Sequence, residues 1–291
     1  MKARKRAGGR RPPLGQHFLQ EASWRRRILA QLDPQPEDCW LEVGAGHGEF
    51  SVPLARTSRA VAAVERDAKL AALLREQLGA FPAARVIEAD ILDLDIKALA
   101  RESGPTKLRV YGSLPYYITS PILRRLFDSL AVIADIHVVV QREVAERLVA
   151  GPGGRGYGYL SVLAQFHARP ELVLAVPRGA FRPAPKVDSA LVRLVTPGQQ
   201  ESLQVGSSAK FLEFLSACFR QKRKTLRNNL RAALPGSQLE GALAEAGLAP
   251  RARAEELSLE SLARLFAAVE RAGGSFAGQR TTVIASALRR S

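Results

Sequence analysis

The chain has few cysteines, and neither of them suggests a covalent or metal-bound framework. Cys39 and Cys218 are its only two, far apart in the sequence and outside any CxxC pair. This excludes a network of disulfides and argues against a zinc site. The four histidines share no ligand spacing either, so no metal is expected.

Long apolar runs are also missing. No stretch approaches the roughly 20 apolar residues of a membrane-spanning helix. The basic start MKARKRAGGRRPP is not followed by the apolar segment of a signal peptide. A cytoplasmic protein is therefore expected, with residues 1–13 as a basic, disordered arm that is either a solvated tail or a segment that touches RNA.

Acidic residues are in deficit. The 43 Lys and Arg against 28 Asp and Glu give a net charge of +15. Such an excess favours a polyanionic partner, nucleic acid first and an anionic membrane surface second. The length of 291 residues allows one large or two ordinary domains.

From residue 38 to about 195, short apolar runs alternate with helical patterns. This alternation predicts an α/β fold, a Rossmann-like, doubly wound sheet of seven strands with a late antiparallel insertion. The expected strands span 39–43, 60–65, 85–89, 108–113, 136–141, 171–176 and 189–195. The expected helices span 50–56, 67–78, 121–130, 142–150 and 159–167. Ligands of such sheets bind at the carboxyl ends of the strands.

The rest of the chain has only helical patterns. Residues 196–208 (TPGQQESLQVGSS) are polar and aperiodic and are interpreted as a linker after a first domain of residues 14–195. Helices are expected at 209–219, 222–234, 238–246 and 257–272, which predicts a small all-α domain over 209–272. The tail 273–291 receives no role.

A glycine motif follows the first expected strand. Residues 42–48 read EVGAGHG, so Gly44 and Gly46 would let the backbone approach a ligand before the next helix. The spacing is not the GxGxxG of dinucleotide enzymes. An acidic residue followed by GxGxG is typical of enzymes that use S-adenosylmethionine.

Two carboxylates end the next strands. Glu65 is placed to accept hydrogen bonds from ribose hydroxyls, and Asp90 to reach an adenine amino group. Each alone is more often a helix cap or a solvated charge. Their succession at neighbouring strand ends favours a cofactor site.

The fourth strand ends in a turn with the sequence Gly-Ser-Leu-Pro-Tyr. An aromatic amine is a poor nucleophile until acceptors bind its two N–H groups and free the nitrogen lone pair. Ser113 and the Leu114 carbonyl, held by Pro115, offer two acceptors, and Tyr116 can stack on a base. Taken alone, the same residues are also a plain strand-ending turn.

Together these motifs resemble the small-subunit ribosomal RNA adenine dimethyltransferase family from residue 14 to about 266. The resemblance implies dimethylation of the N6 amines of two adjacent adenines in 16S RNA during ribosome assembly, with S-adenosylmethionine as cofactor. No self-association signature appears in the sequence, so a monomer is expected. It implies a clamp over the cofactor at residues 14–19 (LGQHFL), with His17 and Leu19, and a base-stacking Phe181 in the motif FRPAPKVDS. Ser113 would also border the cofactor, although the family usually has Asn there.

The resemblance extends into the helical domain, where residues 219–230 resemble the family's basic, RNA-binding helix. A charged helix face is usually only solvated, but here the net charge of the whole chain supports RNA binding. The residues expected to bind RNA are Arg220, Lys222, Arg223, Lys224 and Arg227.

Two alternatives stay open. One is a large-subunit rRNA adenine methyltransferase of the macrolide-resistance type, which shares the fold and the first motifs but lacks the basic helix. The other is a ribosome-assembly or RNA-binding factor that keeps the fold without catalysis. Ser113 favours the second alternative, while Glu65 and Asp90 speak against it.

Overall fold

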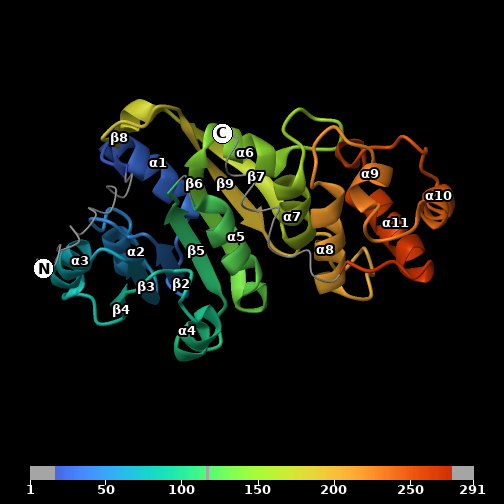
Figure 1. Cartoon of the computed structure of the whole chain (residues 1–291). Helices are drawn as coiled ribbons and strands as arrows, with labels where there is room; N and C mark the ends of the chain where they lie inside the picture. The colour runs from blue at the N-terminus through green and yellow to red at the C-terminus, as the bar shows by residue number, and fades with distance from the viewer. Residues whose placement is uncertain (1–16, 116–117, 277–291) are drawn as a thin grey trace, which may run out of the picture.

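The first half of the molecule is built on a seven-stranded sheet (Figure 1). The computed structural model describes residues 17–115 and 118–276. The strand order is β4-β3-β2-β5-β6-β9-β7, with neighbours parallel from β4 to β6 and β9 antiparallel to both of its neighbours. This confirms the predicted Rossmann-like fold with a late antiparallel strand. The strands are β2 (Cys39–Val43), β3 (Ala60–Glu65), β4 (Ala84–Glu88), β5 (Leu108–Ser113), β6 (Ile133–Gln141), β7 (Arg169–Val176) and β9 (Ser189–Val195).

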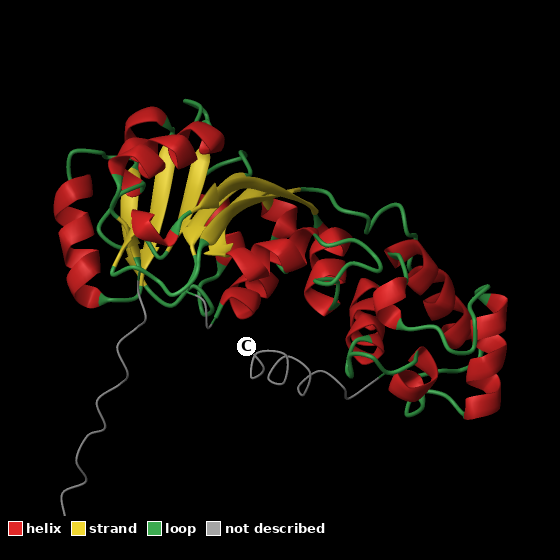
Figure 2. Ribbon diagram, turned by 90° about the horizontal axis from the view of Figure 1, so that it is seen from above, coloured by secondary structure: helices red, strands yellow, loops and turns green. Residues whose placement is uncertain are grey.

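Helices cover both faces of this sheet (Figure 2). Side chains alternate along a strand, so Leu41 of β2 packs with Ile122 on one face and Trp40 with Ile28 on the other. The face of Trp40 is covered by α1 (Ala22–Leu32), α2 (Ser51–Thr57) and α3 (Ala68–Leu78). The face of Leu41 is covered by α4 (Ile96–Glu102), α5 (Thr119–Phe127), α6 (Arg142–Val149) and α7 (Tyr159–His167).

Some elements were not predicted. Helix α1 buries only Ile28 and Leu32, and three consecutive arginines obscure this pattern. Helix α4 was also missed, as were two-residue strands that pair with each other, β1 (Phe18–Leu19) and β8 (Phe181–Arg182). Two short 3₁₀ turns complete the domain, η1 (Leu130–Val132) and η2 (Arg178–Ala180).

The second half is helical, and it shares α7 with the first. Val162 and Phe166 of α7 lie in one apolar cluster with Phe211 and Phe266, while Leu163 faces the sheet. The elements are α8 (Ser208–Cys218), α9 (Leu226–Leu230), α10 (Gly236–Glu245), η3 (Ala254–Glu256) and α11 (Leu259–Arg271). Within the described part of the chain, no helix is long and apolar enough to cross a membrane.

The segment interpreted as a linker is fastened to the end of α7. The Gly198 N–H donates to the His167 carbonyl at 3.0 Å, and the next two N–H groups donate to the carbonyls of Gln165 and Phe166. A Cβ at Gly198 would lie 2.3 Å from the Ala168 nitrogen, so only glycine fits this approach.

Candidate active site

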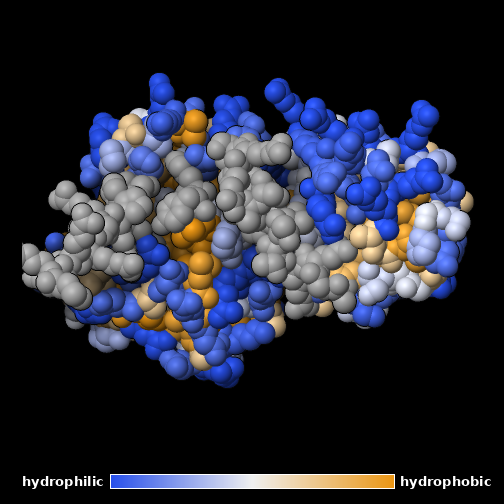
Figure 3. All heavy atoms as spheres, viewed as in Figure 1, coloured by the Kyte–Doolittle hydropathy of each residue, from blue (hydrophilic) through white to orange (hydrophobic). Residues whose placement is uncertain are grey.

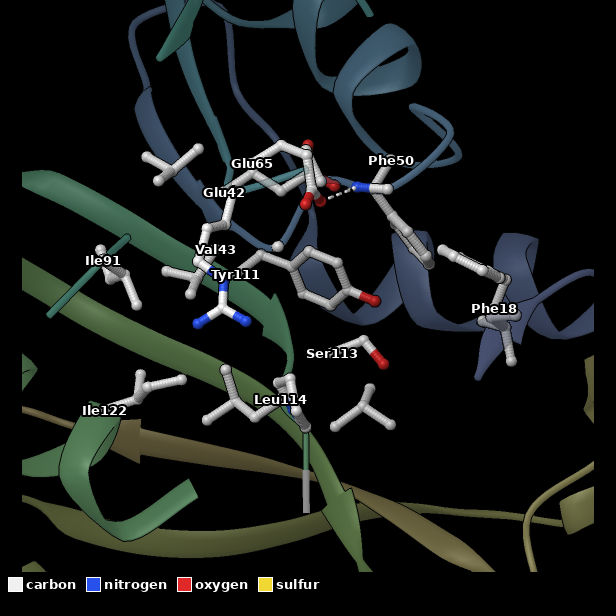
Figure 4. Close-up of a pocket in the computed structure, with 18 of the residues that line it drawn as sticks. Phe18, Glu42, Val43, Phe50, Glu65, Ile91, Tyr111, Ser113, Leu114 and Ile122 are labelled. Carbon is white, nitrogen blue, oxygen red and sulfur yellow. Dashed lines mark hydrogen bonds between the residues drawn. The ribbon is translucent and has the colours of Figure 1, made fainter. Parts of the chain in front are cut away.

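One pocket lies at the carboxyl ends of β2, β3 and β5 (Figure 4). The short β1–β8 ribbon contributes to its wall. The structure brings together here ten of the predicted site residues, namely His17, Leu19, Gly44, Gly46, Glu65, Asp90, Ser113, Leu114, Pro115 and Phe181. Tyr116 lies outside the described residues. Lining residues that the sequence did not single out as site residues include Phe18, Glu42, Phe50, Tyr111 and Ser189.

The glycine loop exposes its backbone to this pocket. Gly44, Gly46 and Gly48 have φ angles of 71°, 58° and 81°, in the left-handed region that favours glycine. A Cβ at Gly44 would meet nothing within 4 Å, whereas one at Gly46 would lie 3.1 Å from the Phe18 ring. The backbone at Gly44 is therefore open to a ligand, whereas the Phe18 ring already lies close against Gly46.

Glu65 holds the loop from the end of β3. One carboxylate oxygen accepts the Gly46 N–H at 3.0 Å and the other accepts the Asp67 N–H at 2.8 Å. The side chain is buried, so its conformation is fixed before any ligand arrives. Each oxygen keeps a further lone pair, which suits the two hydroxyls of a ribose.

Asp90 is oriented by two other groups. One of its oxygens accepts the Leu92 N–H at 3.0 Å, and the other pairs with Arg66 at 3.1 Å. Among the described residues that line the pocket, Arg66 is the only Lys or Arg, against the carboxyl groups of Glu49, Glu65 and Asp90 in addition to that of Glu42. This charge balance disfavours a pyrophosphate and fits the positive sulfonium and ammonium groups of S-adenosylmethionine.

Glu42 is a buried carboxyl group in the same wall. Desolvation raises its pKa from 4.5 to about 8, and the neighbouring Glu49 and Glu65 add to this shift, while a hydrogen bond from the Ser51 hydroxyl opposes it. Glu42 is therefore mostly a neutral acid at pH 7. In the sequence Glu42 stands out only as part of the glycine motif, because the motif does not show that its side chain is buried.

Replacing Glu42 by glutamine should change how stability depends on pH. Because the folded-state pKa is raised, this group's stabilising contribution is complete below about pH 4.5 and is lost as the pH rises towards 8. Glutamine stays neutral at every pH. We therefore expect the free energy of unfolding of Glu42→Gln, minus that of the unchanged chain, to be about 2–4 kcal/mol more positive at pH 8 than at pH 4.5. Urea unfolding across this range measures the effect, and a pH-independent difference would contradict it.

The Ser-Leu-Pro turn is held rigidly at the end of β5. The Leu114 N–H donates to the Val139 carbonyl at 3.0 Å, and the Leu114 side chain is buried in the core. The Pro115 carbonyl accepts the Ile118 N–H and the Thr119 hydroxyl, both at 3.1 Å. Figure 4 shows the Ser113 hydroxyl turned into the pocket.

Phe181 reaches the pocket from the β1–β8 ribbon. Leu19 pairs with Phe181 and Phe18 with Arg182, and the His17 ring bonds to the Pro183 carbonyl at 2.7 Å. Only 2% of Phe181 is exposed, because its ring packs in the apolar cluster under the ribbon. In this state a base would meet only a small part of the ring.

The basic segment does not form the predicted helix. Helix α8 ends at Cys218, and α9 covers only residues 226–230 of the expected 222–234. Instead of a continuous helix, the Asn229 side chain forms hydrogen bonds with backbone groups of this segment. Its amide group donates to the Cys218 and Gln221 carbonyls, and its oxygen accepts the Gln221 N–H. Arg223, at φ 68°, turns the loop in between.

The cations lie mainly on this loop. Arg220 and Lys224 line a surface hollow together with Arg231, and the surface over α9 is hydrophilic (Figure 3). Lys222 approaches the Arg155 carbonyl at 3.5 Å. Arg227 pairs with Glu240 at 2.9 Å. Glu240 lies outside the basic segment 219–230, so the sequence around Arg227 does not predict this ion pair. The hollow thus holds two of the five predicted cations, and a third, Arg227, is partly neutralised.

Residues 9–271 match the family described as ribosomal RNA adenine dimethylase. The chain belongs to this family. A relative from Acidobacterium capsulatum, named ribosomal RNA small subunit methyltransferase A, is 45% identical over 265 residues, which cover 91% of this chain and 93% of the relative. A relative of the same name from Xanthomonas axonopodis pv. citri is 41% identical over 252 residues, covering 87% and 93%.

Two solved structures have the same fold. The chain is similar to a dimethyladenosine transferase from Plasmodium falciparum, with a TM-score of 0.72, 21% identity and coverage of 89% and 100%. It is also similar to the 23S rRNA methyltransferase ErmE, with a TM-score of 0.65, 28% identity and coverage of 87% and 99%. The higher identity to the small-subunit relatives separates the chain from the macrolide-resistance alternative. The prediction of a family that methylates ribosomal RNA adenines with S-adenosylmethionine is confirmed.

Proposed function

We propose that this pocket methylates the N6 amines of two adjacent adenines in 16S ribosomal RNA, each twice, within an assembly-stage small-subunit particle. We further propose that the chain acts as a monomer in the cytoplasm, where such particles are found. One observation supports the chemistry above all others, namely that the Ser113 turn and the glycine loop line a single pocket. The residues that would bind a cofactor and those that would hold a target amine thus face the same space.

The proposed division of roles follows the geometry. S-adenosylmethionine supplies an electrophilic methyl group on sulfur. The backbone of Gly44 and Gly46 would hold its methionine part, with His17, Phe18 and Leu19 closing over it, while Glu65 would accept hydrogen bonds from the ribose. Asp90 would accept a hydrogen bond from the adenine amino group of the cofactor. The apolar side chains of Ile91 and Ile122 line the same pocket.

The target adenine leaves its stack in the RNA and enters from the Pro115 side. The Ser113 hydroxyl oxygen and the Leu114 carbonyl accept its two N–H groups, which frees the nitrogen lone pair. The freed lone pair could then take the methyl group that S-adenosylmethionine would supply, with the sulfur leaving as a neutral thioether and the extra proton lost to water. No strong base is required, because positioning supplies most of the acceleration.

We propose that the basic loop before α9 holds the RNA through its phosphates and that residues 209–272 are the RNA-binding unit. Neutralising Lys222, Arg223 and Lys224 together should make the slope of log Kobs against log salt concentration shallower by about 2–3, since each lost phosphate contact removes roughly 0.7–0.9. Filter binding of small-subunit RNA between 50 and 300 mM salt measures this slope.

A matched control removes the same number of cations elsewhere. Arg85, Lys97 and Arg101 belong to β4 and α4, and none of them lines either the pocket or the basic hollow. Their glutamine variants should leave the slope within about 0.5 of the unchanged chain. An equal loss in both triple variants would mean that net charge, and not the loop, sets RNA affinity.

A further inference from the structure

Tyr111 carries a buried hydroxyl group that the fold leaves unused. The residue is 1% exposed, and its ring packs against Phe50 with 4.4 Å between ring centroids. The hydroxyl oxygen is buried and has no hydrogen-bond partner among the described residues, yet the residue lines the pocket. An unsatisfied buried hydroxyl is costly, so its retention at a binding pocket points to a partner acquired when the pocket fills.

The position of Tyr111 on β5 relates it to Ser113. Residues two apart on a strand point to the same face, so both side chains project from β5 towards the pocket (Figure 4). Across the sheet, Tyr111 pairs in register with Glu42, whose carboxyl group is already bonded to the Ser51 hydroxyl. On β5, Ser113 is the pocket-lining residue besides Tyr111 that carries a hydroxyl group.

The protonation state of Tyr111 suits an accepting role. Burial, together with the carboxyl groups of Glu42 and Glu49, raises the pKa of Tyr111 well above its usual range. The side chain is therefore a neutral phenol, with one donor and a free acceptor lone pair.

Serine poses a problem that an amide or carbonyl oxygen would not. A carbonyl oxygen only accepts hydrogen bonds, whereas a hydroxyl hydrogen can rotate towards the amine and occupy the space of the N–H that should be bound. Ser113 can present its lone pairs to the amine only if another acceptor takes its hydrogen. That acceptor must lie inside the pocket and on the same side of the strand.

We propose that Tyr111 is this acceptor and acts as a positioning residue for Ser113, which rests on the proposed role of Ser113 towards the target amine. The Ser113 hydroxyl donates to the Tyr111 oxygen, directly or through one water. The remaining lone pairs of Ser113 then face the N6 amine. The two hydroxyls are not bonded to each other in this structure, so the contact forms when adenine and cofactor fill the pocket.

The test is a double-mutant cycle between Tyr111→Phe and Ser113→Asn, read by single-turnover methyl transfer to unmethylated small-subunit particles. With Ser113 present, Tyr111→Phe should slow transfer on the order of tenfold, the value of one hydrogen bond. With asparagine at 113, whose oxygen only accepts, the same change should cost less than about twofold. Calorimetry with S-adenosylmethionine and thermal unfolding are measured on all four chains. Tyr111→Phe should leave the affinity for S-adenosylmethionine unchanged and should not lower the unfolding temperature, because it removes a buried hydroxyl that has no partner among the described residues.

Tyr157→Phe is the matched control. Its hydroxyl donates to the Leu257 carbonyl at 2.9 Å where the two halves of the molecule meet, and the residue does not line the pocket. This variant should lower the unfolding temperature without changing the transfer rate.

Each other outcome of the cycle has a meaning. An equal loss in both backgrounds, or no loss in either, would overturn the proposal. A weaker affinity for S-adenosylmethionine would also overturn it, because Tyr111 would then bind the cofactor. If the proposed methyltransferase function itself were wrong, neither the unchanged chain nor Ser113→Asn would transfer methyl groups.

Discussion

Ser113→Ala should slow methyl transfer to unmethylated small-subunit particles by about 30- to 150-fold. The variant removes the side-chain acceptor for the target amine and leaves the turn intact, because the turn is held by the backbone of Leu114 and Pro115 and by the Thr119 hydroxyl. A hydrogen bond that matters mainly in the transition state is worth about 2–3 kcal/mol in a site that excludes water. Rapid-quench incorporation of labelled methyl groups measures the rate.

Ser113→Asn is the matched variant. Its carboxamide oxygen is an acceptor that needs no partner, so this chain should transfer methyl groups at least as fast as the unchanged one. Most of the effect of Ser113→Ala should fall on the rate, with at most a few-fold change in cofactor affinity. Unchanged dimethylation by Ser113→Ala would show that the backbone carbonyl acts alone and would remove Ser113 from the site.

Glu65→Ala should weaken the binding of S-adenosylmethionine on the order of 10²- to 10³-fold. It removes two acceptors for ribose hydroxyls and also leaves the N–H groups of Gly46 and Asp67 without their partner, so the glycine loop loses its anchor. Losing charged hydrogen bonds at a buried site costs about 3–4 kcal/mol. Isothermal calorimetry at low salt measures the affinity.

Glu88→Gln provides the comparison for this experiment. Glu88 lies directly opposite Glu65 in the β3–β4 register but is not among the residues that line the pocket, and it pairs with Arg75 at 2.9 Å. Its replacement should leave the affinity within about twofold, since exposed ion pairs contribute little. If both variants bind S-adenosylmethionine as well as the unchanged chain, Glu65 is not a ligand for the ribose.

The sheet and the centre of the pocket were predictable because each rests on local pattern. Strands such as Cys39–Val43, which is buried along its whole length, appear in the sequence as apolar runs between helical periods. The carboxyl ends of parallel strands meet at one edge, so Gly44, Glu65, Asp90 and Ser113 could be expected to converge. The structure brings all four into one pocket.

What could not be predicted depends on contacts between distant segments. The two-residue strands β1 and β8 have no period of their own and exist only because Leu19 pairs with Phe181. The expected basic helix does not form, because the Asn229 side chain donates a hydrogen bond to the Cys218 carbonyl at the end of α8. Helix propensities do not include such a side-chain hydrogen bond that competes with the helix. The raised pKa of Glu42 and the unused hydroxyl of Tyr111 likewise require burial, which sequence patterns do not give at single positions.

The most direct test is to identify the product. The purified chain, S-adenosylmethionine and unmethylated small-subunit particles are incubated together, the ribosomal RNA is digested to nucleosides, and the methylated adenosines are quantified by mass spectrometry. We expect N6,N6-dimethyladenosine to accumulate to two per 16S RNA, with none when large-subunit particles replace the small ones. Dimethyladenosine in large-subunit RNA, or no methylated adenosine in either, would contradict the proposed function.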